Sequence, residues 1–231
     1  MTETKSSEPD LLEAPLASRR RLQQRSTTTR AKLLVAARAV FVERGYFGAE
    51  VSDIVLRVPI TKGALYHHFG SKEALFEEAC DQIAREVHRA SSDVVRQYSG
   101  DAWKQLIVSI QARFDIIASS PEAQKILLID GPAVLGWRRW REIQADVALE
   151  PLQRTLDILI EQGRIPDQPT RPFAQLLLAA LNDAALAVAS SENPKSESVT
   201  LFAALLTMIN GLRVPADEVS CATDQTEEAT V

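Results

Sequence analysis

Glycine, aromatic residues and cysteine are all scarce in this chain. Of its 231 residues 9 are glycine and two are cysteine, and aromatic residues make up 6%. Alanine and leucine are abundant instead, which favours an all-α protein over a sheet protein. Cys80 and Cys221 are too few and too far apart to suggest a disulfide framework. We expect Cys80 to lie in a helical core and assign no role to Cys221.

The sequence also lacks a long hydrophobic run. Its first residues are polar and acidic and do not resemble a signal peptide. The longest apolar region, residues 176–189, is interrupted by Asn182-Asp183 and is too short to span a bilayer. We therefore expect a soluble, cytoplasmic protein.

Positive charge is concentrated in one part of the chain, although the net charge is −5. Residues 19–72 contain 11 Lys/Arg against 3 Asp/Glu, whereas residues 73–231 contain 14 against 24. Phosphate attraction can act through the basic part, while the acidic part discourages indiscriminate binding to DNA.

The segment from Thr61 to Phe76 indicates the function most directly. Thr61 can cap a short helix, in which Leu65 and Phe69 lie one turn apart and face a core. This helix is followed by a break and by the start of a long helix at Ser71. The outer face is positive, aromatic and able to form hydrogen bonds, which suits the major groove of DNA. That face consists of Lys62, Gly63, Tyr66 and His67.

Two helices are expected before this segment. The first begins at Thr29 and ends near Arg44, because Gly45 is a typical helix terminator. The second covers about 51–58 and is stopped by Pro59. With the helix after Thr61, the two short helices form a helix-turn-helix whose second member occupies the recognition position.

Residues 1–28 are expected to be disordered, with a basic arm at Arg19–Arg21 and Arg25. Such an arm can reach phosphates or the minor groove. The alternative is a solvated tail without contacts, and both interpretations stay open.

The rest of the chain is predicted to be helical. A long helix covers 71–97, and others cover 101–118, 122–129, 133–163, 170–191 and 197–212, separated by glycine and proline. Pro151 predicts a kink or a second helix within 133–163. The expected domains are a helix-turn-helix unit at 29–72 and a larger helical domain at 73–212, followed by a disordered acidic tail at 213–231.

These features resemble the tetracycline-repressor (TetR) family of bacterial regulators. The resemblance covers about 48 residues. It is carried by Thr29-Arg30, Ala36-Ala37, Phe41, Gly45-Tyr46, Val51, Asp53-Ile54, the run from Thr61 to Phe69, and Ser71 to Leu75. It implies a DNA-binding domain followed by a ligand-binding and dimerisation domain, with no cofactor.

The resemblance assigns roles to the recognition segment. It implies that Thr61, Lys62, Gly63 and Ala64 meet base edges. The side-chain chemistry agrees, because lysine can donate to a purine, glycine allows close approach, and a methyl group can touch thymine. Phosphate contacts are implied for Tyr66, His67 and Lys72, and Arg30 is also expected to contact DNA.

Two positions depart from the family pattern. Ala49-Glu50 replaces the usual Thr or Ser that caps the second helix and donates to phosphate, and Ser52 is the candidate substitute. Val58-Pro59 replaces the usual Ala-Gly of the turn, so that the recognition helix can be tilted.

Metal and enzyme sites have little support. Adjacent residues such as His67 and His68 point about 100° apart on a helix and cannot bind one metal ion together. There is no phosphate-binding glycine loop and no nucleophile elbow. Charges such as Asp130 are expected to be solvated rather than catalytic.

A ligand pocket and a dimer interface are expected in the acidic part. Trp137 and Trp140 can line an apolar cavity with Ile110, Phe114, Leu127 and Leu128, although the same residues can form a core. The resemblance implies a four-helix homodimer interface, and its alternative is an intramolecular core. The interface residues would be Phe173, Leu177, Leu181, Ala184, Leu201, Phe202, Leu205 and Ile209.

The sequence therefore predicts a homodimeric, sequence-specific DNA-binding transcriptional regulator that acts as a repressor. A small, largely apolar effector would release it from a pseudo-palindromic operator. The alternative is a non-specific architectural DNA-binding protein without an effector.

Overall fold

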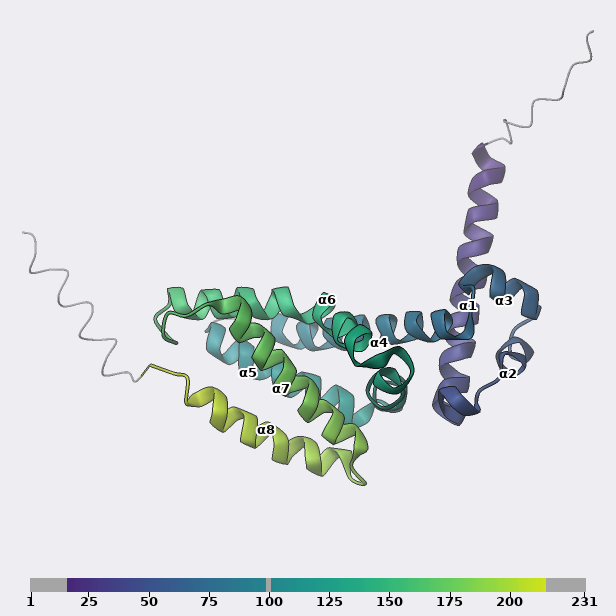
Figure 1. Cartoon of the computed structure of the whole chain (residues 1–231). Helices are drawn as coiled ribbons and strands as arrows, with labels where there is room; N and C mark the ends of the chain where they lie inside the picture. The colour runs from purple at the N-terminus through teal and green to yellow at the C-terminus, as the bar shows by residue number, and fades with distance from the viewer. Residues whose placement is uncertain (1–15, 99–100, 215–231) are drawn as a thin grey trace, which may run out of the picture.

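The protein is a bundle of helices with a smaller helical unit at one end (Figure 1). The computed structural model describes residues 16–98 and 101–214, and side chains from residue 26 onward. No strand occurs in these ranges, in agreement with the predicted all-α class. The helices are α1 (Leu16–Gly48), α2 (Val51–Leu56), α3 (Lys62–Phe69), α4 (Lys72–Arg96), α5 (Ala102–Ser119), the π-helix η1 (Ala123–Asp130), α6 (Gly131–Glu161), α7 (Thr170–Ser190) and α8 (Pro194–Asn210).

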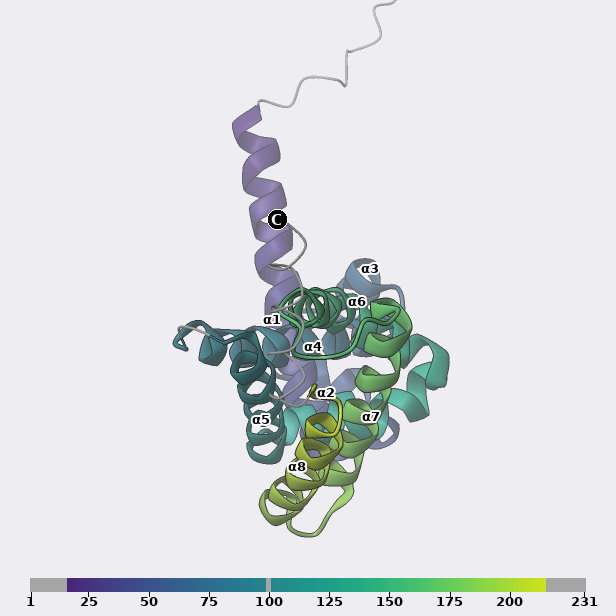
Figure 2. The ribbon, with the colours of Figure 1, turned by 90° about the vertical axis from the view of Figure 1, so that its left-hand side faces the viewer.

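Helix α1 begins earlier than the sequence predicted. Residues 16–28, expected to belong to a disordered arm, are helical and continuous with the predicted first helix. This stretch contains leucine, alanine, arginine and glutamine but neither glycine nor proline, so that no residue stops the helix before Gly45. The N-terminal part of α1 projects away from the other helices in both views (Figures 1 and 2). Residues 1–15 lie outside the described part.

Helices α1, α2 and α3 form the predicted helix-turn-helix unit. The helical backbone of α1 is interrupted at Gly45, whose φ of 66° is accessible mainly to glycine. Ile54 of α2 and Leu65 of α3 are fully buried against α1. A second left-handed glycine, Gly70 with a φ of 79°, ends α3 and lets α4 begin at once.

Helix α4 connects this unit to the larger helical body (Figure 1). Near its start Phe76 packs edge-on against Phe41 of α1, with the ring centroids 5.1 Å apart. One turn later Cys80 is fully buried, as predicted, and burial raises the pKa of its thiol. One continuous hydrophobic core therefore runs from the helix-turn-helix unit into the body.

Polar contacts also fix the junction between the two parts. The carboxylate of Asp130, which is 6% exposed, accepts a hydrogen bond from the backbone N–H of Tyr46 at 2.8 Å and pairs with Lys125 at 3.1 Å. The expectation that Asp130 is solvated was wrong, because the end of η1 packs against the end of α1. Arg38 of α1, with a side chain only 11% exposed, pairs with two glutamates, Glu86 and Glu122.

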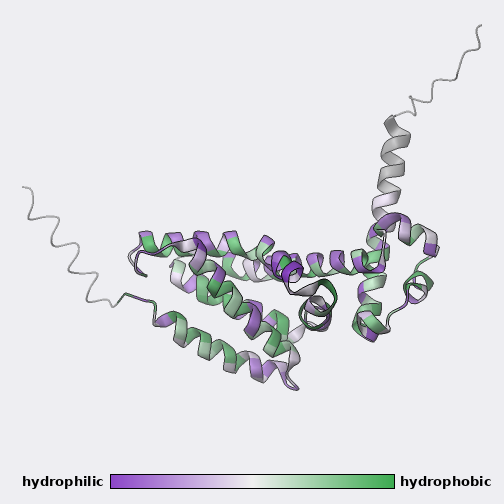
Figure 3. Ribbon diagram, viewed as in Figure 1, coloured by the Kyte–Doolittle hydropathy of each residue, from purple (hydrophilic) through white to green (hydrophobic). Residues whose placement is uncertain are grey.

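The body consists of α4 to α8, whose apolar faces meet inside (Figure 3). Helix α6 contains both Pro151 and a break, but the non-helical residue is Gly136, with a φ of 75°. The backbone angles of α6 stay helical at Pro151, so the break lies fifteen residues earlier than the sequence predicted. The core contact of this region is Trp140, whose indole N–H donates to the carbonyl oxygen of Leu127 at 2.7 Å.

Helix α7 is long and apolar enough to cross a membrane by length and composition, yet half of its most apolar window is buried in the body. The buried half packs against α5, η1, α6 and α8. After α8 the backbone N–H of Val214 donates to Arg164, so residues 213–214 of the predicted tail are held against the body. Residues 215–231 lie outside the described part.

Candidate nucleic-acid interface and ligand cavity

Helix α3 presents a polar face because its two large apolar residues are buried. The Thr61 hydroxyl accepts a hydrogen bond from the backbone N–H of Ala64 at 3.2 Å, which caps the helix and leaves its own O–H free to donate. Leu65 is fully buried and Phe69 is 8% exposed. The residues left exposed are Thr61, Lys62, Gly63, Tyr66 and His67. The structure thus brings the predicted base-contacting residues onto one surface with Tyr66 and His67, with Ala64 half-buried at its edge.

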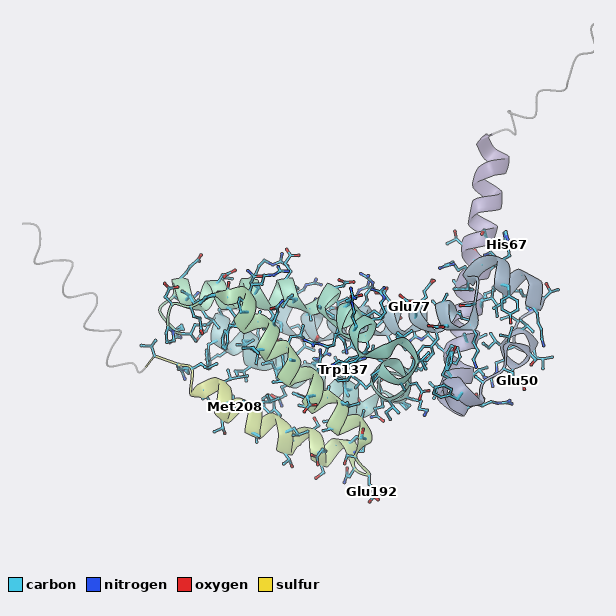
Figure 4. The ribbon with its side chains drawn as sticks, in the orientation of Figure 1. Glu50, His67, Glu77, Trp137, Glu192 and Met208 are labelled. Atoms are coloured by element: carbon cyan, nitrogen blue, oxygen red, sulfur yellow. The ribbon has the colours of Figure 1, made fainter. Side chains whose placement is uncertain are left out.

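Gly63 is not required by the protein's own packing. A Cβ atom added there would meet no atom closer than the Thr61 hydroxyl oxygen, at 3.9 Å. Within the described residues nothing crowds this position, so a need for glycine would come from an outside surface that approaches the backbone. Tyr66, which is 48% exposed, lies on the same surface, as does His67 (labelled in Figure 4).

The start of α2 is built differently from the predicted phosphate contact. Ala49 is buried, and the backbone N–H of Glu50 is held by the carboxylate of Asp53 at 3.0 Å. The hydroxyl of Ser52, the expected substitute donor, donates to the Glu50 carboxylate at 2.8 Å. Ser52 could meet a phosphate only after it breaks this bond, and Glu50 lies exposed beside it (Figure 4).

Arg30 is also engaged inside the protein. Its guanidinium donates to the carbonyl oxygen of His68 at 2.5 Å and to the Glu78 carboxylate, with Nε at 3.1 Å, and it lies over the ring of Phe69. These contacts tie α1 to α3 and α4. Arg30 thereby orients the recognition helix, and its charge is already matched by a carboxylate.

Lys72 occupies a different setting at the first position of α4. Its ammonium lies 4.2 Å above the ring of Tyr46, the residue whose backbone N–H is held by Asp130. Burial lowers the pKa of Lys72, an effect that Glu50 partly opposes.

Ion pairs neutralise part of the positive charge that the count of Lys and Arg indicated for this region. Carboxylates pair with four arginines of this region, namely Arg30, Arg38, Arg44 and Arg57. Three of those carboxylates belong to the body. Lys62 forms no ion pair with any described residue. Among the lysine and arginine side chains that the structure describes in this region, those without an ion pair are therefore Lys32 on α1, Lys62 on α3 and Lys72 at the start of α4.

A cavity of about 320 Å³ lies between α4, α5, α6 and α7. Leu106, Ile110, Leu152, Leu178 and Leu181 form its apolar wall. Its polar lining residues include His88, Ser91, Ser109, Arg113 and Thr155. The volume is at the lower end of the range of about 300–1,000 Å³ for small-molecule sites.

The predicted ligand residues lie mostly elsewhere. Of the six, only Ile110 lines this cavity, while Phe114, Leu127, Leu128 and Trp140 are core residues with at most 1% exposure. Trp137 is 51% exposed and borders a surface groove between α6 and α7 (Figure 4). These five residues therefore stay a prediction that this cavity does not support: Trp140 turns inward to donate to Leu127, whereas Trp137 stacks on its outer side.

Sequence reasoning missed Arg113, the buried one of the two arginines that line the cavity. A signal was present, since Arg113 follows Leu106 and Ile110 at spacings of seven and three and so lies on their helical face. A charge on an apolar face is either paired or functional. The guanidinium is 7% exposed and donates to the side-chain oxygen of Asn182 at 3.1 Å.

The predicted dimer residues lie largely inside the monomer. Five of the eight, Leu177, Leu181, Ala184, Leu205 and Ile209, are at most 8% exposed, and the other three are half-buried. The large apolar residues that α7 and α8 expose are instead Leu176, Val199 and Met208, each more than 60% exposed, and exposed alanines such as Ala179 and Ala203 lie on the same helices. The predicted helices thus do expose apolar surface, but through other residues, because the predicted ones hold α7 and α8 against each other and the body.

Comparisons with known proteins match both parts of the chain. The family model described as "Bacterial regulatory proteins, tetR family" matches residues 33–79, and "Tetracyclin repressor-like, C-terminal domain" matches residues 103–212. The repressor AcnR of Corynebacterium diphtheriae is 31% identical over 153 residues, which cover 66% of this chain and 74% of AcnR.

Solved structures show the same similarity. A TetR-family transcriptional regulator from Pectobacterium atrosepticum superposes with a TM-score of 0.72 and 33% identity, over 83% of this chain and 97% of that one. RolR in complex with its ligand resorcinol has a TM-score of 0.63 and 19% identity, over 80% of this chain and 89% of RolR, which shows a shared fold.

Proposed function

The chain belongs to the TetR family of DNA-binding transcriptional regulators, and from this premise we propose that it is a homodimeric repressor released from a pseudo-palindromic operator by a small, largely apolar effector. The observation that carries the proposal is the polar face of α3, held outward by the burial of Leu65 and Phe69. A cytoplasmic location follows, because the operator DNA is there.

The recognition surface divides into two kinds of contact. Thr61, Lys62, Gly63 and Ala64, at the start of α3, would read base edges in the major groove. Tyr66, His67 and Lys72 would hold phosphates and fix the orientation without reading sequence. The projecting, arginine-containing start of α1 is a further candidate for phosphate contact.

Dimerisation would use the exposed apolar residues of α7 and α8. Two-fold symmetry gives two recognition helices, each in one half-site of the palindrome. Val199→Asp and Met208→Asp should each convert the dimer to a monomer in light scattering, because a charge enters the interface. Leu56→Asp is the matched control, since Leu56 is 83% exposed on α2, away from α7 and α8.

The effector would bind in the cavity between α4 and α7 and act through α4. This helix lines the cavity at His88 and Ser91 and carries Lys72 at its other end, so one rigid element reaches both sites. RolR, which has the same fold, binds the small aromatic molecule resorcinol. For tenfold release of DNA the effector must prefer the non-binding state by about 1.4 kcal/mol.

Footprinting and gel shifts test the proposal. The protein should protect a palindrome in the DNA upstream of its own gene but not in a scrambled duplex. Lys62→Ala should change the preference among operator variants, whereas Tyr66→Ala should weaken binding to all of them. Equal binding to native and scrambled DNA would instead favour an architectural binder, and unchanged binding by both variants would reject α3 as the recognition helix.

A further inference from the structure

The cavity contains a buried cation without a counter-charge. Arg113 is 7% exposed, and its one hydrogen bond goes to the neutral amide oxygen of Asn182. Its Nε is buried and has no acceptor among the described residues. Burial lowers the pKa of Arg113 to about 10, so the side chain still carries its charge at neutral pH.

A second arginine with little exposure, Arg38, has the carboxylate partners that Arg113 lacks among the described residues. Arg38, 11% exposed in its side chain, meets Glu86 at 2.7–2.8 Å and also Glu122, so that two carboxylates surround it. A buried charge without a partner strongly destabilises the folded state relative to a paired one. The Arg113 guanidinium has five N–H donors, and one amide oxygen accepts from it. Most of its hydrogen-bonding capacity is therefore open to a bound molecule.

The rest of the cavity lining does not supply the missing charge. None of its described lining residues is Asp or Glu. The second arginine, Arg96, is already paired with Asp93 at 2.6 Å at the solvent-exposed rim. His88 is held toward its neutral form, because burial and then the charge of Arg113 lower its pKa. The field inside the cavity is therefore positive.

Three of the lining hydroxyl groups are already engaged as donors, and Arg113 is the buried charged donor of the described lining. Ser91, Ser109 and Thr155 each donate to a carbonyl oxygen of their own helix, at 2.8–3.1 Å. They can therefore offer only lone pairs to a ligand. The same cavity is also lined by leucine and isoleucine side chains.

We propose that the effector of this regulator is a compact apolar carboxylate, whose carboxylate group binds the Arg113 guanidinium while its hydrocarbon or aryl body fills the leucine-lined part of the cavity. A bidentate pair with a carboxylate matches the planar geometry of the guanidinium. The inference rests on the proposed function, because it names the chemical class of the effector at the proposed effector cavity.

The test uses the full-length protein and two matched series of probes. One series contains straight-chain and phenyl-substituted carboxylic acids, and the other contains the corresponding primary amides, which have the same shape without the charge. Calorimetry on the DNA-free protein should show acids binding at least tenfold more tightly than their amides. Arg113→Met should abolish this preference, and Arg113→Lys should retain part of it.

Arg96→Met is the control variant, because it removes a lining charge that is exposed and already paired. It should keep the acid preference, and thermal denaturation should confirm that each variant folds. Amides that bind as tightly as acids, failure of both series to bind, or an acid preference that survives Arg113→Met would overturn the inference.

Operator release is measured separately by fluorescence anisotropy. Acids that bind the protein but do not release DNA would count against the proposed ligand-responsive function and leave the carboxylate site intact. Loss of the acid preference in a protein that still binds its operator would count against the carboxylate site alone.

Discussion

Lys72 provides a quantitative test of the DNA-binding mode. Its ammonium lies 4.2 Å above the Tyr46 ring at the start of α4, and it is proposed to contact a phosphate. Lys72→Gln removes the charge and keeps a side chain of similar length. The cation–π contact contributes only about 0.5–1 kcal/mol to stability. The variant should therefore fold, and its defect should appear in DNA binding.

The size of the defect follows from counterion release. Each phosphate neutralised by the protein contributes about 0.9 to the slope of log affinity against log salt concentration. A homodimer that loses one contact per subunit should lose about 1.8 from this slope. Between about 50 and 200 mM salt the native affinity should thus fall roughly tenfold more than that of the variant.

Fluorescence anisotropy with operator and scrambled duplexes measures both slopes. Lys72→Gln should weaken binding to the two duplexes by a similar factor, because a phosphate contact carries no sequence information. Lys195→Gln on α8 is the control, since it removes the same charge from an exposed lysine outside the recognition unit. An unchanged slope, or a loss confined to the operator, would refute the phosphate role of Lys72.

Three further predictions concern stability. Gly131→Ala should cost about 1–3 kcal/mol and lower the Tm by roughly 2–12 °C, because its methyl group would lie 2.9 Å from a buried indole. Gly63→Ala, whose site on a helix is open, should not lower the Tm in calorimetry. Arg38→Met should lower the free energy of unfolding in urea by about 1–3 kcal/mol, since two glutamates lose their partner. The exposed ion pair of Arg57 should contribute at most about 1 kcal/mol, and equal losses in the two variants would contradict the difference in burial. Because burial lowers the pKa of His88, the unfolded chain takes up a proton at a higher pH than the folded protein does. The free energy of unfolding should therefore fall as the pH drops below about 6.5 and level off below the folded-state pKa. His88→Gln should flatten this part of the stability–pH profile, and identical profiles for the two proteins would exclude the effect.

The helix-turn-helix could be predicted because its signals are local. The cap at Thr61 and the pair Leu65 and Phe69 lie within one short segment, and a helix of fixed pitch then decides which residues remain outside. The start of α1 could not be predicted in this way. Several residues before Thr29 are good helix formers, and a possible cap at Thr29 does not oblige a helix to begin there.

The cavity could not be located from the sequence because burial depends on neighbouring helices. Trp137 and Trp140 are three residues apart and have similar apolar character, yet one is 51% exposed and the other 1%. The difference arises from η1, which provides the Leu127 carbonyl oxygen for Trp140 alone. The net charge of the DNA-binding surface could not be predicted for the same reason. Arginines of α1 are neutralised by glutamates that lie far away in the sequence, namely Glu78, Glu86 and Glu122.

The sequence by itself determined the helical class, the helix-turn-helix and the outward face of α3, since periodicity, capping and breaks act over a few residues. Only the tertiary structure decided that Arg113 has no carboxylate partner, that Arg30 orients α3, and which apolar residues of α7 and α8 remain exposed. These properties depend on which side chains meet across helices, and contacts of that kind are set by packing of the whole chain rather than by any one segment.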